Sequence, residues 1–316
     1  MAYIASATFP NGWLNFELSV LRRLQFSSIA LPFTGEPNIC LQLKRWRVRV
    51  AANDPMTWSF TKALAMVEND SEKLSEAEIE SIIEDAYVPR ERLDNPTLLN
   101  WFNETDAWWL DNVRFNAERL ATPYKRAIAL TLGMMVGDYV LSFGEDNRQL
   151  REPLSLSRVF RQLAETLPFP SDNSLRSKAT NQDVRAFVAE RRHTDLLFLR
   201  LPAPVVQSPA SNQTIPGWRE EWLQGGGDFW NELERKRAGK LGSRVQSKQQ
   251  YLELIEDLLH TAAHIPTWAI AHMENGFLAT EELVETVNRV RRVDAVYSKD
   301  FSDLLGVRAA IVTASG

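Results

Sequence analysis

Two segments near the start of the chain end in residues that could hold a nucleotide-like ligand. Residues 31–35 (LPFTG) follow an apolar run, and residues 52–54 (AND) end an alternating run that begins at Arg47. With a helical pattern over 39–46 between them, they predict strand, loop, helix, strand and a terminal acid, which is half of a Rossmann unit. In such units the loop approaches the ligand closely and the acid binds ribose hydroxyls. The pattern is also common in βαβ segments that bind no nucleotide, and Asn53-Asp54-Pro55 is equally typical of a turn that ends a strand.

A cationic run lies in the second half of the chain. It contains no acid and follows a stretch rich in aromatic residues, 218–230. Its members are Arg235, Lys236, Arg237, Lys240, Arg244 and Lys248. Basic residues interleaved with aromatic ones suit a phosphate backbone or splayed bases, so the run is a candidate nucleic-acid contact. The alternative is a solvated loop, because Gly239 and Gly242 loosen the segment.

Two further groups of residues invite a functional reading. His260 and His264 have the spacing of metal ligands on one helix face. The glutamate of an HExxH motif is missing and no third ligand lies nearby in the sequence, so we expect no metal. Most of the ten tryptophans, including Trp108 and Trp109, are expected to fill a core or a partner interface rather than to stack on bases.

Local patterns predict the elements that must position these residues. Strands are expected at 28–33, 47–52, 195–201 and 267–273, and helices at 14–26, 39–46, 123–136, 182–188, 247–264 and 280–292. The segment 66–170 is expected to be mostly helical, and Ser75 and Glu78 form a capping-box pattern within it. Residues 203–227, rich in proline and ending in a glycine triplet, predict a loop.

Composition narrows the range of partners and settings. The chain has 316 residues, with 36 Lys and Arg against 41 Asp and Glu, which gives a net charge of −5. Proteins that grip duplex DNA usually present a basic face, so this charge disfavours DNA unless a local basic stripe exists. The longest apolar run, 127–143, contains Asp138 and is too short for a convincing membrane span. Cys40 is the only cysteine, which excludes an intrachain disulfide and favours a reducing cytoplasm.

Four short segments, taken in their order along the chain, form one series of motifs. Residues 9–13 read FPNGW, 31–35 read LPFTG, 52–54 read AND, and 195–203 read DLLFLRLPA. This series resembles the motifs of the Dam-like adenine-N6 DNA methyltransferases, which are FPGGK, EPFAGSG, NDxN and a DPPY that follows an apolar strand. Where the first motif of the family ends in lysine, this chain has Trp13.

The resemblance implies an α/β fold with a Rossmann-like S-adenosylmethionine-dependent methyltransferase core over 1–65 and 171–316. It implies a helical insertion at 66–170 that resembles the family's target-recognition domain. It also implies that the cofactor is held by Pro32, Phe33, Gly35 and Asp54, with Asp54 taking the ribose hydroxyls. Glu36 and Pro37 stand where the family has a small residue and a glycine. They are expected to weaken cofactor binding, because proline lacks an N–H and Glu36 adds an anion beside the cofactor's carboxylate.

The last motif decides the chemistry that the resemblance implies. In the family, the Asp side chain and a proline carbonyl accept hydrogen bonds from the adenine amino group, while the aromatic ring stacks on the flipped base. The corresponding positions here are Arg200, Leu201, Pro202 and Ala203. Arginine has only donors and alanine offers no stacking surface. No catalytic residue is therefore assigned, and adenine methylation is not expected.

The sequence thus predicts a degenerate DNA adenine methyltransferase-like protein that acts by binding nucleic acid or a partner protein, as in a DNA-modification or phage-defence system. Two alternatives stay open. An active DNA methyltransferase of altered specificity would use S-adenosylmethionine with a different acceptor. A purely structural interaction protein would use neither a cofactor nor a nucleic acid.

Overall fold

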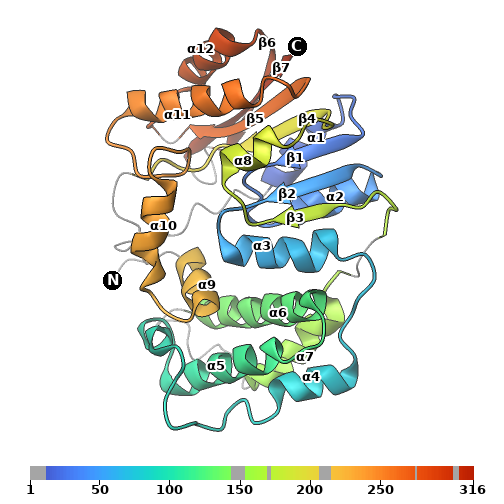
Figure 1. The fold of residues 1–316 in the computed structure, drawn as a ribbon, viewed down its shortest axis with the longest axis vertical. Helices are drawn as coiled ribbons and strands as arrows, with labels where there is room; N and C mark the ends of the chain where they lie inside the picture. Colours follow the sequence, from blue (N-terminus) through green and yellow to red (C-terminus); the bar gives the residue numbers. More distant parts are fainter. Residues whose placement is uncertain (1–11, 144–153, 169–171, 206–214, 275, 302–305) are drawn as a thin grey trace.

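A seven-stranded sheet with helices on both faces occupies the upper half of the molecule in Figure 1. The structure, a computed structural model, describes residues 12–143, 154–168, 172–205, 215–274, 276–301 and 306–316. The strands are β1 (Ser28–Leu31), β2 (Arg49–Asn53), β3 (Lys178–Thr180), β4 (Leu196–Arg200), β5 (Thr267–Glu274), β6 (Val293–Phe301) and β7 (Val307–Ser315).

The order of the strands reverses direction once within the sheet. The order is β3-β2-β1-β4-β5-β7-β6, with parallel pairing from β3 to β5 and antiparallel pairing of β7 with both β5 and β6. The chain runs outward from β1 to β3 and then returns to place β4 beside β1. This reversal is a topological switch point, where open α/β sheets bind ligands beyond the carboxyl ends of their strands. The expected α/β, Rossmann-like class is confirmed.

Each face of the sheet packs against its own set of helices. Along β1, Ile29 and Leu31 belong to a hydrophobic cluster with α1 and α2, whereas Ala30 belongs to a second cluster with α8, α11 and α12. This alternation is the period of two that a strand imposes on its side chains. These helices are α1 (Trp13–Leu21), α2 (Asn38–Arg45), α8 (Val184–Ala189), α11 (Lys248–Thr261) and α12 (Thr280–Val290).

A layer of helices lies beside the sheet, beyond α3 (Figure 1). The remaining elements are α3 (Thr57–Ala63), η1 (Leu64–Glu68), α4 (Glu76–Ile83), η2 (Pro96–Asn100), α5 (Glu104–Glu118), α6 (Pro123–Leu141), α7 (Leu156–Thr166), α9 (Ile215–Gln224) and α10 (Phe229–Arg237). The capping box of Ser75 and Glu78 at the start of α4 is confirmed. The core of this layer also takes in Trp58, Trp218 and Trp222, which lie outside 66–170. The domain limits drawn from the sequence therefore stay predictions.

The prediction of a loop over 203–227 is wrong, because residues 215–224 form α9. Pro216 lies in the first turn of this helix, where a proline costs no hydrogen bond, and the glycine triplet begins just after the helix ends. The helix is held by burial of Trp218 and Trp222, both fully buried. Gly137 and Gly133 of α6 leave room for these rings. The cationic run is also partly helical, since it begins within α10.

No helix within the described residues combines the length and the apolar character that a bilayer crossing needs.

Candidate functional site

Three of the four motif segments meet at the switch point between β1 and β4. The guanidinium of Arg200, at the end of β4, donates from Nη1 to the carbonyl of Thr34 at 3.0 Å. The amide of Gly35 donates to Oδ2 of Asp54, which follows β2, at 2.9 Å. Of the first motif, Phe9, Pro10 and Asn11 lie outside the described residues, and Trp13 opens α1.

The centre of this site is filled by a buried ion pair. Arg200 donates from Nε to Oε1 of Glu17 and from Nη2 to Oε2, both at 2.7 Å, which is a bidentate fork. Trp13 donates from Nε1 to the same Oε1 at 2.7 Å. Glu17 has no exposed surface and Arg200 is 8% exposed. The position that carries the catalytic acid in the resembled family is therefore a cation held inside the protein.

The ion pair determines the charge state of its surroundings. Burial alone would lower the pKa of Arg200, but the carboxylate of Glu17 outweighs it and raises that pKa above its ordinary value. Cys40 of α2 lies close enough to feel both charges, and burial raises the pKa of its thiol to about 12. The thiolate is the reactive form of cysteine, so Cys40 is chemically inert in the folded protein.

Asp54 binds the backbone of its own loops. Its carboxylate accepts from Gly35 through Oδ2 and from Met56 through Oδ1, each at 2.9 Å. The contact with Met56 is the local side-chain turn typical of an aspartate that ends a strand. Burial raises the pKa of the Asp54 carboxyl, although the two amides act in the opposite direction. The turn that the sequence suggests is present, whereas the role in binding ribose stays a prediction.

Glu36 takes part in a network of charges that reaches the helical layer. Lys62 of α3 lies 2.8 Å from its Oε1, and Arg219 of α9 lies 2.7 Å from the same atom. Arg219 also lies 2.6 Å from Oδ2 of Asp138 in α6. Burial alone would raise the pKa of Glu36, but the two cations hold it below its ordinary value. The ring of Trp58 lies under both cations, 5.5 Å from Nζ of Lys62 and 4.9 Å from Cζ of Arg219.

The remaining motif positions are also engaged within the protein. The carbonyl of Pro202 accepts from the hydroxyl of Tyr251 at 2.6 Å. The carbonyl of Pro32 accepts from Nδ2 of Asn53 at 3.1 Å. Phe33 packs so close to Gly242 that a side chain there would lie 3.3 Å from its ring. Leu201 pairs through its amide with β5, and Ala203 is exposed. The carbonyl of Pro202, the proline kept from the last motif, therefore already accepts one hydrogen bond within the protein.

The cationic run does not form one open basic face. Lys236 pairs with Glu232 at 2.7 Å and Lys240 pairs with Asp183 at 2.8 Å. Arg237 is half-buried near Asp54 and donates to the sulfur of Met56 at 2.9 Å. Burial lowers the pKa of Arg237, and the nearby acids only partly offset this. Arg235 and Arg244 are exposed, so they are the members of the run best placed to meet a phosphate.

The histidine pair shows no sign of a metal site. Nε2 of His260 lies 3.9 Å from Oε1 of Glu256, and Nδ1 of His264 lies 3.1 Å from the carbonyl of Thr261. Across the described ranges, no group of three or more His, Cys, Asp or Glu side chains could hold a metal ion.

Sequence reasoning missed Glu17, Lys62 and Arg219. Glu17 alone carries a signal that could have been used, because it shares the inward face of α1 with Trp13 and Val20 and an acid on an apolar face needs a partner. No protein-family model matches the chain, and no curated protein matches it. The site must therefore be interpreted from its own geometry.

Proposed function

We propose that the chain is a degenerate relative of the Dam-like adenine-N6 DNA methyltransferases that acts by binding and not by methyl transfer. The strand order supports this reading, because it is compatible with the Rossmann-like core that the resemblance implies. The meeting of the motif segments at one switch point supports it too. The observation that carries the proposal is the buried pair of Arg200 and Glu17.

The pair opposes the chemistry of the resembled family for two reasons. Transfer to an exocyclic amine needs an acceptor for the amine's N–H, and Arg200 offers only donors. Glu17 cannot take over as acceptor, because both of its oxygens already bind Arg200 and its side chain has no exposed surface. Losing one positioned polar group in a transition state commonly lowers a rate by about 100- to 1000-fold. Here the acceptor and the stacking ring are both replaced.

The residues at the cofactor positions do not fit S-adenosylmethionine as the family binds it. Asp54 is 6% exposed, and each of its oxygens already accepts a backbone amide. Glu36 brings a carboxylate to the loop after β1, and ion pairs with Lys62 and Arg219 balance its negative charge. We therefore expect no saturable binding of this cofactor.

The proposal is tested by two measurements on the full chain. The first incubates the protein with labelled S-adenosylmethionine and duplex DNA and counts methyl groups transferred to adenine. The second titrates the cofactor into the protein by calorimetry. We expect no transfer and no binding heat. Transfer that depends on the cofactor and disappears in Asp54→Ala would refute the proposal and would establish the active enzyme of altered specificity.

A further inference from the structure

The turns at the amino ends of the strands carry a concentration of exposed arginines. This edge lies opposite the switch point, on the side of the sheet away from α9 and α10 (Figure 1). The turns that lead into β1, β2, β3 and β4 are adjacent, because these strands are neighbours in the sheet. The exposed arginines on these turns are Arg22, Arg23, Arg45, Arg47, Arg176 and Arg192, which together are called the arginine rim.

The acids near the arginine rim form hydrogen bonds or an ion pair outside the rim, although the exposed Asp172 keeps its negative charge beside it. Oδ2 of Asp195 accepts from the amide and hydroxyl of Ser27 and from the amide of Ser28, which lowers the pKa of Asp195 despite partial burial. Asp172 accepts from the amide of Ser174. Glu190 pairs with Arg191. Within the described part of the chain, no rim arginine forms a salt bridge, in contrast to Lys236 and Lys240 of the cationic run.

The local structure holds the rim arginines in place. The guanidinium of Arg22 lies 5.0 Å from the ring centre of Trp46, and that of Arg23 lies 5.2 Å from the ring centre of Tyr297. A guanidinium stacked on a ring keeps its N–H donors free at its edge. Arg47 and Arg176 have φ values of 60° and 50°, a left-handed conformation in which glycine is favoured. Arginine at such positions is a strain that tends to occur at functional sites.

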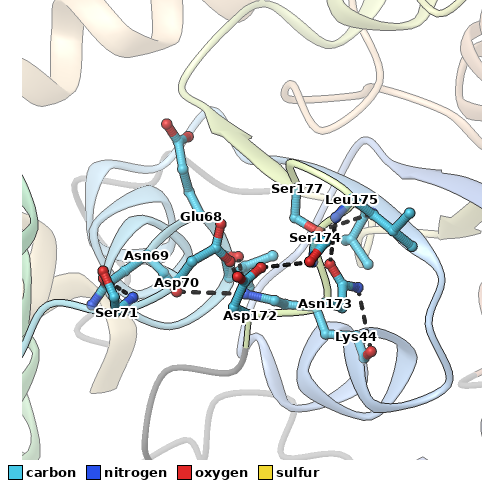
Figure 2. Close-up of polar contacts among 12 residues, drawn as sticks. Lys44, Glu68, Asn69, Asp70, Ser71, Asp172, Asn173, Ser174, Leu175 and Ser177 are labelled. Atoms are coloured by element: carbon cyan, nitrogen blue, oxygen red, sulfur yellow. Dashed lines mark hydrogen bonds and ion pairs between the residues drawn. The ribbon is translucent and has the colours of Figure 1, made fainter.

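A polar cleft of about 460 Å³ opens within the arginine rim, lined by Lys44, Arg45, Arg47 and the segment 172–175. Figure 2 shows how its wall is fixed: Nδ2 of Asn173 donates to the carbonyl of Lys44 at 3.3 Å and to that of Val48 at 3.0 Å. The ammonium of Lys44 turns away from the cleft toward Asp70, at 2.9 Å. Arg45 and Arg47 are therefore the cations that an anion in the cleft would meet, and they outnumber the one carboxylate of the lining, that of Asp172.

We infer that the arginine rim binds the sugar-phosphate backbone of a nucleic-acid duplex without reading its sequence. Neighbouring strands are about 4.8 Å apart, so the four turns span about 15 Å, over which duplex DNA presents several phosphates. The guanidinium of an arginine presents a fork of donors that matches a phosphate better than the ammonium of a lysine does, and the exposed Lys178 at the start of β3 is already paired with Glu68. Of the exposed large apolar residues, four belong to the helical layer or its loops (Tyr87, Val88, Leu99 and Phe115), and Val296 is a single residue on β6. A membrane surface fits less well, because interfacial binding needs apolar side chains to insert.

The inference rests on the binding role in the proposed function but not on the loss of methyl transfer. It is tested by fluorescence anisotropy of the full chain with a labelled duplex of about 20 base pairs, at about 50 to 300 mM KCl. The affinity should fall steeply with salt. In the variant Arg47→Gly/Arg176→Gly, the slope of log affinity against log salt should become shallower by about 2, with about 10-fold weaker binding at low salt. Glycine suits both φ values, so the thermal unfolding temperature should not fall.

A matched control removes the same charge elsewhere. Arg158 on α7 and Arg308 at the start of β7 are both exposed and lie away from the rim. Arg158→Ala/Arg308→Ala should bind the duplex as the unchanged chain does. A third variant, Arg235→Ala/Arg244→Ala, tests the cationic run.

Three outcomes would overturn the inference. The first is a loss of binding in the variant of Arg235 and Arg244 with none in the variant of Arg47 and Arg176. The second is an equal loss in the control. The third is the absence of duplex binding at low salt, whether or not the chain binds vesicles of anionic lipid. Methyl transfer to DNA would refute the proposed function but would not contradict duplex binding by the arginine rim.

Discussion

Removing the charge of Glu17 should strongly destabilise the fold. The variant Glu17→Gln keeps the shape of the side chain but removes the carboxylate charge that the buried guanidinium of Arg200 now binds in a bidentate fork. It also turns an amide N–H toward one of the donors that now lie 2.7 Å from the carboxylate. Breaking a buried ion pair from one side costs about 3–5 kcal/mol, because the remaining charge cannot regain water.

The double variant Glu17→Leu/Arg200→Met separates this cost from the loss of packing. It removes both charges and replaces them with apolar side chains of similar length, and it takes away the carboxylate that accepts from the N–H of Trp13 and the guanidinium that donates to the carbonyl of Thr34. Apolar replacement of a whole buried pair is often neutral or stabilising. We expect the double variant to be more stable than Glu17→Gln by about 2 kcal/mol or more, which is half of the middle of the single-variant range.

Urea unfolding, followed by far-ultraviolet circular dichroism and tryptophan fluorescence, measures both effects. With a slope of about 3 kcal/mol/M for a chain of this size, the midpoint of Glu17→Gln should fall by about 1 M or more. The reasoning fails if Glu17→Gln costs less than about 1 kcal/mol, the range of an exposed pair, or if the double variant is no more stable than the single one.

Two further predictions concern the helical layer and the sheet. In Gly137→Ala, the added methyl group would clash with the ring of Trp218, so the free energy of unfolding should fall by about 1–3 kcal/mol although alanine is the better helix former. A gain in urea midpoint would contradict the packing of α9 against α6. Burial lowers the pKa of His272, whose Nε2 lies 3.0 Å from the carbonyl of Leu278. The unfolded state therefore takes up a proton at a higher pH than the folded state does. The free energy of unfolding should therefore fall as the pH drops below about 6.5. In His272→Gln the free energy of unfolding should depend less on pH in this range. Equal pH dependence in the two proteins would exclude His272 as the source of the fall.

Much of the fold could be predicted because its signals are local. The capping box at Ser75, the helix that begins at Thr280 and the strand that begins at Thr267 each follow from residues within one element. The strands β6 and β7 were not predicted. Side chains along β6 alternate between partial burial and exposure, so it lacks the apolar run that marked β1 and β4. The strand β3 has three residues and depends on β2 for its pairing.

The candidate site was harder to predict because its partners are distant in sequence. The properties of Arg200 alone showed that it could not accept a hydrogen bond, but its partner Glu17 is 183 residues away. The turn at Asp54 follows from local chemistry, whereas its bond to Gly35 depends on the pairing of β1 with β2. The arginine rim could not be identified from the sequence, because its members come from separate turns that become neighbours only through the strand order.

The contacts around α9 show why binding at the switch point would be costly. Glu220 of α9 accepts from the amides of Thr57 and Trp58, at 3.0 and 2.9 Å, and so satisfies the free N–H groups at the start of α3. Arg219, its neighbour, joins Glu36 to α6. Moving α9 to admit a ligand would expose these groups together with two buried tryptophans. A surface that binds without rearrangement pays no such penalty, which favours the amino edge of the sheet over the switch point as the place where this protein meets a partner.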